Sequence, residues 1–183
     1  YLASKGGNGA AEVTLGIYNS IKERKKLFEI DDRKVSIIFM NLFFKIYQIL
    51  KISRKMSKFF KSEQKNIVII EGASWVGFSF IFFILSKLSI KKIKYVYHSH
   101  NIEYDIRHNH NNNFLISFLT KVFENYIFKN CDYTTVVSAE DQKRIKKLYN
   151  INSSILENGI DIKRLKIKKP HFKLPKFYFM YIG

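Results

Sequence analysis

The sequence predicts an α/β fold, a Rossmann-like doubly wound parallel sheet with helices on both faces. Short apolar runs typical of strands alternate with longer segments whose apolar residues recur at helical spacing. A glycine-rich turn, Gly6-Gly7-Asn8-Gly9, precedes the first helical segment. A polar cluster beginning at His98 directly follows an apolar run, and open α/β sheets bind ligands at such strand ends.

In the first half of the chain, a helix is expected after the glycine turn, where Ala10, Val13 and Ile17 recur at helical spacing. A strand is expected over residues 35–40, and a long amphipathic helix over residues 42–61. Its expected inward stripe is Leu42, Ile46, Ile49, Met56 and Phe60, and its opposite, basic stripe is Lys45, Gln48, Lys51, Lys55 and Lys58.

Residues 67–70 predict a compact strand, followed by an apolar helix that starts near Trp75. The uncharged stretch 72–86 is about 15 residues long, short of the roughly 18 to 20 that a membrane-spanning helix needs. It therefore predicts a buried helix.

In the second half, strands are expected over residues 93–97, 133–137 and 154–156, with a loop at 109–113 and a helix at 114–128. Ser138 to Asp141 form a capping box that begins another helix. We expect one Rossmann-like domain over residues 1–165 and a linker over 166–176. Residues 177–183 would be the first strand of a truncated second domain.

The net charge is +17, from 32 Lys and Arg against 15 Asp and Glu. Such an excess favours phosphates, anionic lipid or nucleic acid, although a biased composition rich in Lys, Ile and Asn would also produce it. The single cysteine, Cys131, excludes a disulfide within the chain and fits a reducing compartment.

The glycine turn lacks the third glycine of a dinucleotide fingerprint and the Gly-Lys-Ser/Thr ending of a nucleoside-triphosphate loop. Small residues before a helix leave backbone N–H groups free to bind an anion. The alternative is a plain connection.

Four of the five histidines, His98, His100, His108 and His110, form two His-x-His pairs. Such pairs could bind zinc or another divalent metal, but a loop rich in Asn and His is usually only solvated, so we predict no metal. His100 could act as a base or orient a ligand. The alternative is a structural imidazole whose hydrogen bonds are satisfied within the fold.

Several short motifs follow one another in a definite order: Gly6-Gly7-Asn8-Gly9, Ile67-Val68-Ile69-Ile70, Tyr97-His98-Ser99-His100-Asn101-Ile102-Glu103, Cys131-Asp132-Tyr133-Thr134-Thr135-Val136-Val137-Ser138, Leu156-Glu157-Asn158-Gly159-Ile160-Asp161 and Met180-Tyr181-Ile182-Gly183. Together they resemble the N-terminal half of retaining glycosyltransferases of family 4, which have the GT-B fold. Glu157 departs from the proline that is usual in the family.

The resemblance implies a role for each motif. The amides of Gly6, Gly7, Asn8 and Gly9 would approach the donor diphosphate, and His100 would be the catalytic residue. The acceptor would be bound by His98, Asn101 and Glu103. The hinge between the domains would be formed by Asn158 and Gly159. No cofactor or metal is implied.

The predicted function is transfer of a sugar from a nucleotide-sugar, bound mostly by the missing second domain, to a cell-envelope polysaccharide or lipid-linked acceptor. We expect the chain to be a fragment that is inactive in isolation. It would be cytoplasmic and touch the inner membrane face through Lys45, Lys51, Lys55 and Lys58. The alternative is a non-catalytic basic module that binds a membrane surface or nucleic acid, although the sequence holds no nucleic-acid motif.

Overall fold

The computed structural model describes residues 2–5, 9–22, 25–31, 38–60, 66–71, 75–89, 93–110 and 113–158. Within these ranges six strands form one sheet in the order β2-β1-β3-β4-β5-β6, and every neighbouring pair is parallel. The strands are β1 (Leu2–Lys5), β2 (Phe28–Asp31), β3 (Asn66–Glu71), β4 (Ile93–Ser99), β5 (Tyr133–Val136) and β6 (Ser154–Ile155).

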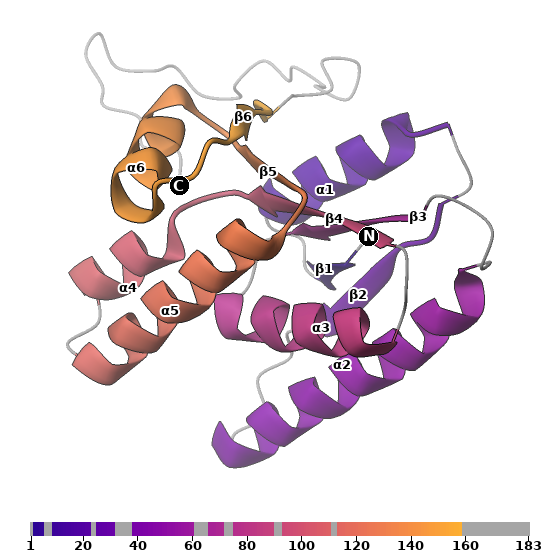
Figure 1. Cartoon of the computed structure of the whole chain (residues 1–183). Coiled ribbons are helices and arrows are strands. Elements are labelled where there is room, and N and C mark those ends of the chain that lie inside the picture. The colour runs from indigo at the N-terminus through magenta and orange to yellow at the C-terminus, as the bar shows by residue number, and fades with distance from the viewer. Residues whose placement is uncertain are drawn as a thin grey trace, which may run out of the picture.

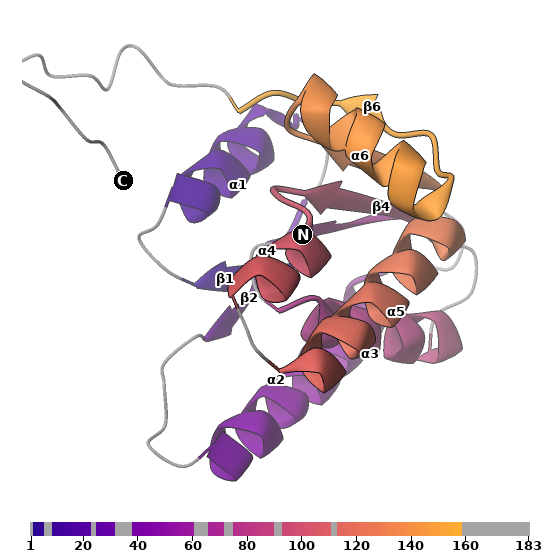
Figure 2. The same ribbon diagram turned by 90° about the vertical axis from the view of Figure 1, so that its left-hand side faces the viewer.

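Helices connect these strands and cover the sheet, which gives the predicted Rossmann-like α/β architecture. They are α1 (Gly9–Ser20), α2 (Ile38–Phe59), α3 (Val76–Ser89), α4 (Glu103–His110), α5 (Phe114–Asn130) and α6 (Ala139–Tyr149). Helix α1 lies on one face of the sheet, whereas α2, α3 and α5 lie side by side on the other (Figures 1 and 2). Helix α6 packs against β5 and β6.

The core lies between the central strands and this helical layer. Alternate residues of β3 and β4, namely Val68, Ile70, Tyr95 and Tyr97, are at most 2% exposed. Aromatic rings from the helices meet these strands edge-on, with Phe83 4.9 Å from Tyr95 and Phe128 5.5 Å from Tyr97 between ring centroids. Such ring pairs add specific geometry to the hydrophobic burial.

Helix α6 confirms the capping prediction. The Ser138 hydroxyl accepts a hydrogen bond from the Asp141 N–H at 3.1 Å and so satisfies one free donor of the first turn. The helix ends at Asn150, whose left-handed backbone conformation (φ 57°) closes the last turn.

The strand predicted over residues 35–40 is wrong, because residues 38–40 form the first turn of α2. The edge strand is instead β2, which the periodicity analysis missed. Phe28 and Ile30 are buried there while Glu29 is exposed, so the alternation of a half-buried strand is present over only four residues.

The loop predicted over residues 109–113 is also wrong in part, because Asn109 and His110 belong to α4. This helix is short and polar, and its carboxylates contact Arg107 and Arg144 while Tyr104 packs against the core. Glu103 and Asp105 lie in its first turn, where the positive end of the helix dipole favours acidic side chains.

The predicted linker and truncated strand (residues 166–183) lie outside the described residues, as does the turn at Gly6, Gly7 and Asn8. Across the described ranges, every helix is too short or too polar to cross a membrane.

Candidate functional site

The candidate site lies where β3 and β4 end. In a parallel sheet all carboxyl ends meet at one edge, and the strand order here reverses between β1 and β3. Open α/β sheets bind ligands beside such a switch point. Glu71, the last residue of β3, pairs in register with His98 of β4, so the two strands bring their polar residues together at this edge.

Glu71 and His100 form a close pair at the edge. The His100 Nε2 lies 2.7 Å from the Glu71 Oε2, and the two side chains are 6% and 0% exposed. A hydrogen bond of this length, shielded from water, fixes the orientation of the imidazole. The sequence analysis did not select Glu71; its one signal is a carboxylate directly after the apolar run of β3.

His98 joins this pair from within β4. Its Nδ1 lies 2.8 Å from the Thr135 Oγ1 of β5, and its ring meets the His100 ring edge-on, with centroids 4.6 Å apart. Burial lowers the pKa of His98, while the nearby Glu71 carboxylate partly opposes this shift. The imidazole of His98 is therefore neutral near pH 7 and offers one nitrogen as an acceptor or ligand.

Three buried polar atoms of this cluster have no hydrogen-bond partner among the described residues: Glu71 Oε1, His98 Nε2 and His100 Nδ1. Buried polar atoms are nearly always paired in folded proteins, so each exception needs an explanation. One ligand atom from each of the three residues also lies within 4.8 Å of the others, so they are the residues that could hold a metal ion.

The second His-x-His pair does not join this cluster. His108 is exposed on α4 and its ring stacks on Tyr104, with centroids 5.4 Å apart. The side chain of His110 lies outside what the structure describes.

The remaining predicted site residues are placed as follows. Asn101 is exposed beside the cluster, and its carbonyl accepts a hydrogen bond from the Ser99 hydroxyl at 2.6 Å. Glu103 is 8% exposed, and burial raises its pKa, although Arg107 beside it lowers it in part. Gly9 is the first residue of α1, and Asn158 is exposed after β6. Gly159 lies outside the described residues, with Gly6, Gly7 and Asn8.

A second buried carboxylate, Glu124 of α5, was missed by the sequence analysis. Its oxygens accept the N–H groups of Glu103 at 2.7 Å and Tyr104 at 3.2 Å, and the Tyr149 hydroxyl at 2.6 Å. Burial raises the pKa of Glu124 to about 7, although these hydrogen bonds oppose the shift. Glu124 thus satisfies the first turn of α4 and ties α4, α5 and α6 together.

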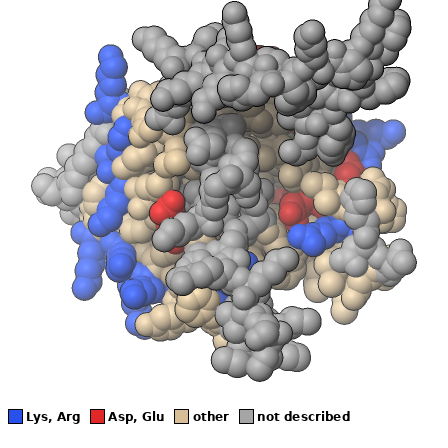
Figure 3. Space-filling model, turned by 180° about the vertical axis from the view of Figure 1, so that it is seen from behind, with Lys and Arg blue, Asp and Glu red and all other residues tan. Residues whose placement is uncertain are grey.

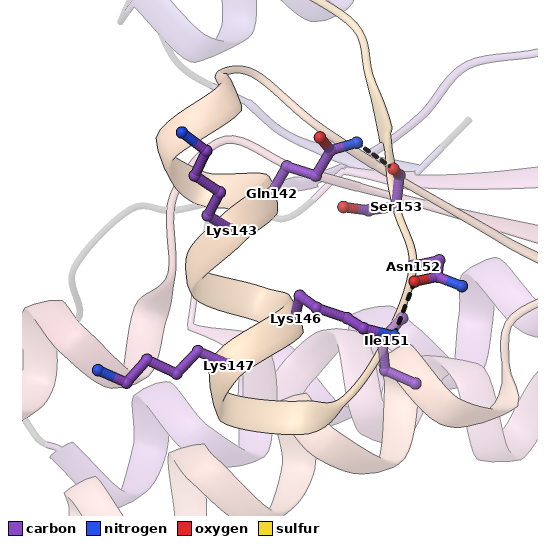
Figure 4. Close-up of a pocket in the computed structure, with 7 residues that line it drawn as sticks. All are labelled: Gln142, Lys143, Lys146, Lys147, Ile151, Asn152 and Ser153. Atoms are coloured by element: carbon purple, nitrogen blue, oxygen red, sulfur yellow. Dashed lines mark hydrogen bonds between the residues drawn. The ribbon is translucent and has the colours of Figure 1, made fainter.

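A surface hollow of about 530 Å³ lies away from the carboxyl edge, between α6 and the segment that leads to β6 (Figure 4). The Lys146 ammonium donates to the Asn152 side-chain oxygen at 2.9 Å, while Lys143 and Lys147 project from the same helix. Lysines in the last turn of a helix complement the negative end of its dipole. We therefore interpret the hollow as a solvated helix end rather than as the site.

The fold is that of a Rossmann-like domain, a class of open parallel sheets that bind ligands beside the switch point. The sequence model of Glycosyltransferase Family 4 matches residues 12–164. The chain therefore belongs to this family, which confirms the resemblance drawn from its motifs. A comparison with curated proteins found no match.

Proposed function

We propose that the chain is the acceptor-side domain of a retaining glycosyltransferase that moves a sugar from a nucleotide-sugar to a cell-envelope polysaccharide or a lipid-linked acceptor. The observation that carries this proposal is the buried Glu71–His100 pair at the carboxyl edge of a sheet of this family. We expect a second domain to supply most donor contacts, and the isolated chain to be inactive.

In this proposal His100 acts at the reaction centre and Glu71 positions it. The protein contributes mainly orientation and electrostatic stabilisation of the departing nucleotide diphosphate. The 2.7 Å contact with Glu71 holds the His100 ring through its Nε2, which leaves the Nδ1 to form a hydrogen bond with the sugar or the acceptor oxygen. His98, Asn101 and Glu103 would contact the acceptor.

The glycine turn would hold the donor diphosphate. Gly9 begins α1, and the turn joins this helix to β1, the strand next to β3. The first N–H groups of a helix and the positive end of its dipole favour a phosphate at that position. Asn158 and Gly159 would form the hinge to the second domain.

Contact with the membrane surface would fall to α2. Its exposed stripe is apolar and mostly aromatic in the first half and basic in the second: Phe43, Phe44, Tyr47 and Leu50, then Lys51, Arg54, Lys55 and Lys58. This combination suits a helix that lies in the interface of an anionic bilayer at the cytoplasmic face. Lys45 departs from the predicted stripe, because it is only half-exposed and its ammonium lies 4.9 Å from the Phe78 ring centroid.

The charge distribution supports a surface contact of this kind. On the face opposite to that of Figure 1, Lys and Arg side chains gather mainly along one flank, and few carboxylates of the described residues are visible there (Figure 3). The same charge is the observation that favours the alternative, a non-catalytic basic module for membrane or nucleic acid. Binding to unrelated DNA that weakens steeply with salt, together with indifference to nucleotide-sugars, would favour that alternative.

The membrane contact is tested with the triple substitution of Lys51, Lys55 and Lys58 by Gln. Each basic residue near an anionic surface contributes about 1 kcal/mol, so binding to phosphatidylglycerol vesicles should weaken by roughly 100-fold. The matched control replaces Lys143, Lys146 and Lys147 by Gln, which removes the same charge from α6. Equal losses in both variants would show that charge alone, and not α2, governs binding.

The proposed reaction is tested by His100→Ala in the protein that contains this chain. Transfer of labelled sugar from a panel of nucleotide-sugars to a lipid extract should fall by about 100-fold or more. His108→Ala, an exposed histidine on α4, is the control and should leave the rate unchanged. A wild-type rate for His100→Ala would remove His100 from the reaction.

A further inference from the structure

We propose that the exposed face of helix α5 is a second lipid-contacting surface, which seats the domain, together with α2, on an anionic bilayer. Five large apolar side chains of α5 are exposed along one stripe of the helix: Phe114, Leu115, Phe118, Val122 and Tyr126. This inference rests on the membrane contact proposed for α2 and adds a second helix to it.

The first three turns of α5 place polar residues inside the domain and apolar residues outside. Ser117, Thr120 and Glu124 are at most 4% exposed, whereas Phe114 and Phe118 are 81% and 52% exposed. A helix whose outer face meets water normally shows the reverse arrangement. The outer face of α5 is therefore suited to an apolar environment.

The exposed apolar side chains of α5 form a continuous surface. The rings of Phe114 and Phe118 stack on each other, with centroids 6.3 Å apart and an angle of 21° between the ring planes. Leu115, beside Phe114 in the first turn, is also largely exposed. Single apolar residues are common on protein surfaces, but a contiguous group marks a site of interaction.

The charge of this face indicates the kind of partner. The sequence of α5 has one acidic residue, the buried Glu124, and that of α2 has none, whereas Lys121 and Lys129 are exposed on α5. Two copies of the chain would meet here through faces of the same sign, which disfavours self-association. An anionic bilayer offers both negative charge for the lysines and an apolar layer for the rings.

The position of this face agrees with that of α2. Helices α2 and α5 pack on either side of α3, and both begin at the same end of the helical layer, at the lower left of Figure 1 (see also Figure 2). Helix α4, which follows the end of β4, lies toward this end as well. Because the exposed aromatic residues, such as Phe43 and Phe118, lie in the first halves of α2 and α5, the bilayer would contact the end of the domain that holds the Glu71–His100 pair.

The test combines Phe114→Gln with Phe118→Gln in the protein that contains this chain, and measures co-sedimentation with vesicles of phosphatidylglycerol and phosphatidylcholine. A ring that leaves water contributes roughly 10-fold to binding, so the double variant should bind at least about 30-fold more weakly. This loss should persist at high salt, which screens the lysines. The matched control combines Ile67→Gln with Leu88→Gln, at exposed positions of β3 and α3, and should bind as wild type.

A second measurement reports whether the face of α5 enters the lipid. Brominated lipid should quench the added fluorescence of Phe118→Trp, but not that of Leu88→Trp, against the constant background of the single native tryptophan, Trp75. A double variant that binds as tightly as wild type, a control that loses as much binding, or an unquenched Phe118→Trp would overturn the inference.

The outcomes separate α5 from the rest of the proposed function. Loss of binding in the triple lysine variant of α2, without loss in the double phenylalanine variant, would leave the α2 contact standing and overturn that of α5. A wild type that binds no anionic vesicles would overturn both contacts. Sugar transfer is measured separately with His100→Ala, so the α5 surface can fail while the proposed reaction stands.

Discussion

Two buried carboxylates, Glu124 and Glu71, are satisfied very differently. Both oxygens of Glu124 accept hydrogen bonds, from two backbone N–H groups of α4 and from the Tyr149 hydroxyl. Glu71 has one bonded oxygen, while its other oxygen has no partner among the residues that the structure describes. Glu124 therefore links α4, α5 and α6 through its hydrogen bonds. Glu71 keeps one oxygen that can still accept a hydrogen bond at the edge of the sheet.

This difference separates a carboxylate that stabilises the fold, Glu124, from one that is available to a ligand, Glu71. A buried polar group with all its partners adds rigidity, whereas an incompletely paired one costs stability and is retained where a ligand needs it. We therefore expect substitution of Glu124 to lower stability, and substitution of Glu71 to lower activity with little change in stability.

The largest effect on stability is expected for Glu124→Ala. It removes the partner of three buried donors, so the free energy of unfolding should fall by about 3 to 4 kcal/mol. Urea unfolding at pH 6 measures this change. Glu157→Ala, at an exposed position, is the control and should stay within about 0.5 kcal/mol of wild type. Equal effects at the two positions would contradict the structural role of Glu124.

The contribution of Glu124 to the free energy of unfolding should depend on pH. Burial raises the pKa of Glu124 in the folded chain from its ordinary value of 4.5 to about 7, so the folded state holds this proton more tightly than the unfolded state. The resulting stabilisation is fully present below pH 4.5 and is lost as the pH rises through about 7.

The measurement is the free energy of unfolding of wild type minus that of Glu124→Gln, followed from pH 4.5 to 8. It should decrease by roughly 2 to 3 kcal/mol over this range. Taking the difference between the two chains removes the contributions of the other titrating groups. A difference independent of pH would show that the pKa of Glu124 is the same in the folded and unfolded chains, and would contradict its shift on burial.

A smaller loss is expected for Tyr149→Phe. The ring and its contact with Phe128, at 5.3 Å between centroids, are kept, while the hydrogen bond to Glu124 is removed. Unfolding free energy should fall by about 1 to 2 kcal/mol. Tyr133→Phe, at a residue that is 58% exposed, should have almost no effect in the same assay.

The smallest effect on stability is expected for Glu71→Gln. An amide keeps the shape of the side chain and a possible contact with His100, and it removes a buried charge that is only partly paired. The unfolding free energy should change by less than about 1 kcal/mol. A loss as large as that of Glu124→Ala would show that Glu71, like Glu124, mainly stabilises the fold.

The fold class was predictable because its signal is strong over long segments. The apolar runs of β3 and β4 and the helical periodicity of α2 and α5 placed these elements close to their observed bounds. The short edge strand β2 was missed, since four residues carry too little alternation to stand out. Helix α4 was missed because it is polar and its first turn depends on Glu124, which is distant in the sequence.

The site was predictable only in part. The sequence analysis singled out His98 and His100 as a His-x-His pair, and their rings are in contact. Glu71 comes from another strand, so only the parallel register shows that it meets them. The roles given to these residues, and to the glycine turn, remain predictions.

The most direct test compares Glu71→Gln with Glu124→Gln in the protein that contains this chain, as sugar transfer per folded molecule at saturating donor. We predict that Glu71→Gln folds as stably as wild type but transfers sugar at least about 10-fold more slowly, because His100 loses its carboxyl partner. Glu124→Gln should be less stable at pH 6 yet keep the wild-type rate per folded molecule. A wild-type rate for Glu71→Gln would contradict the assignment of the β3–β4 edge as the functional site.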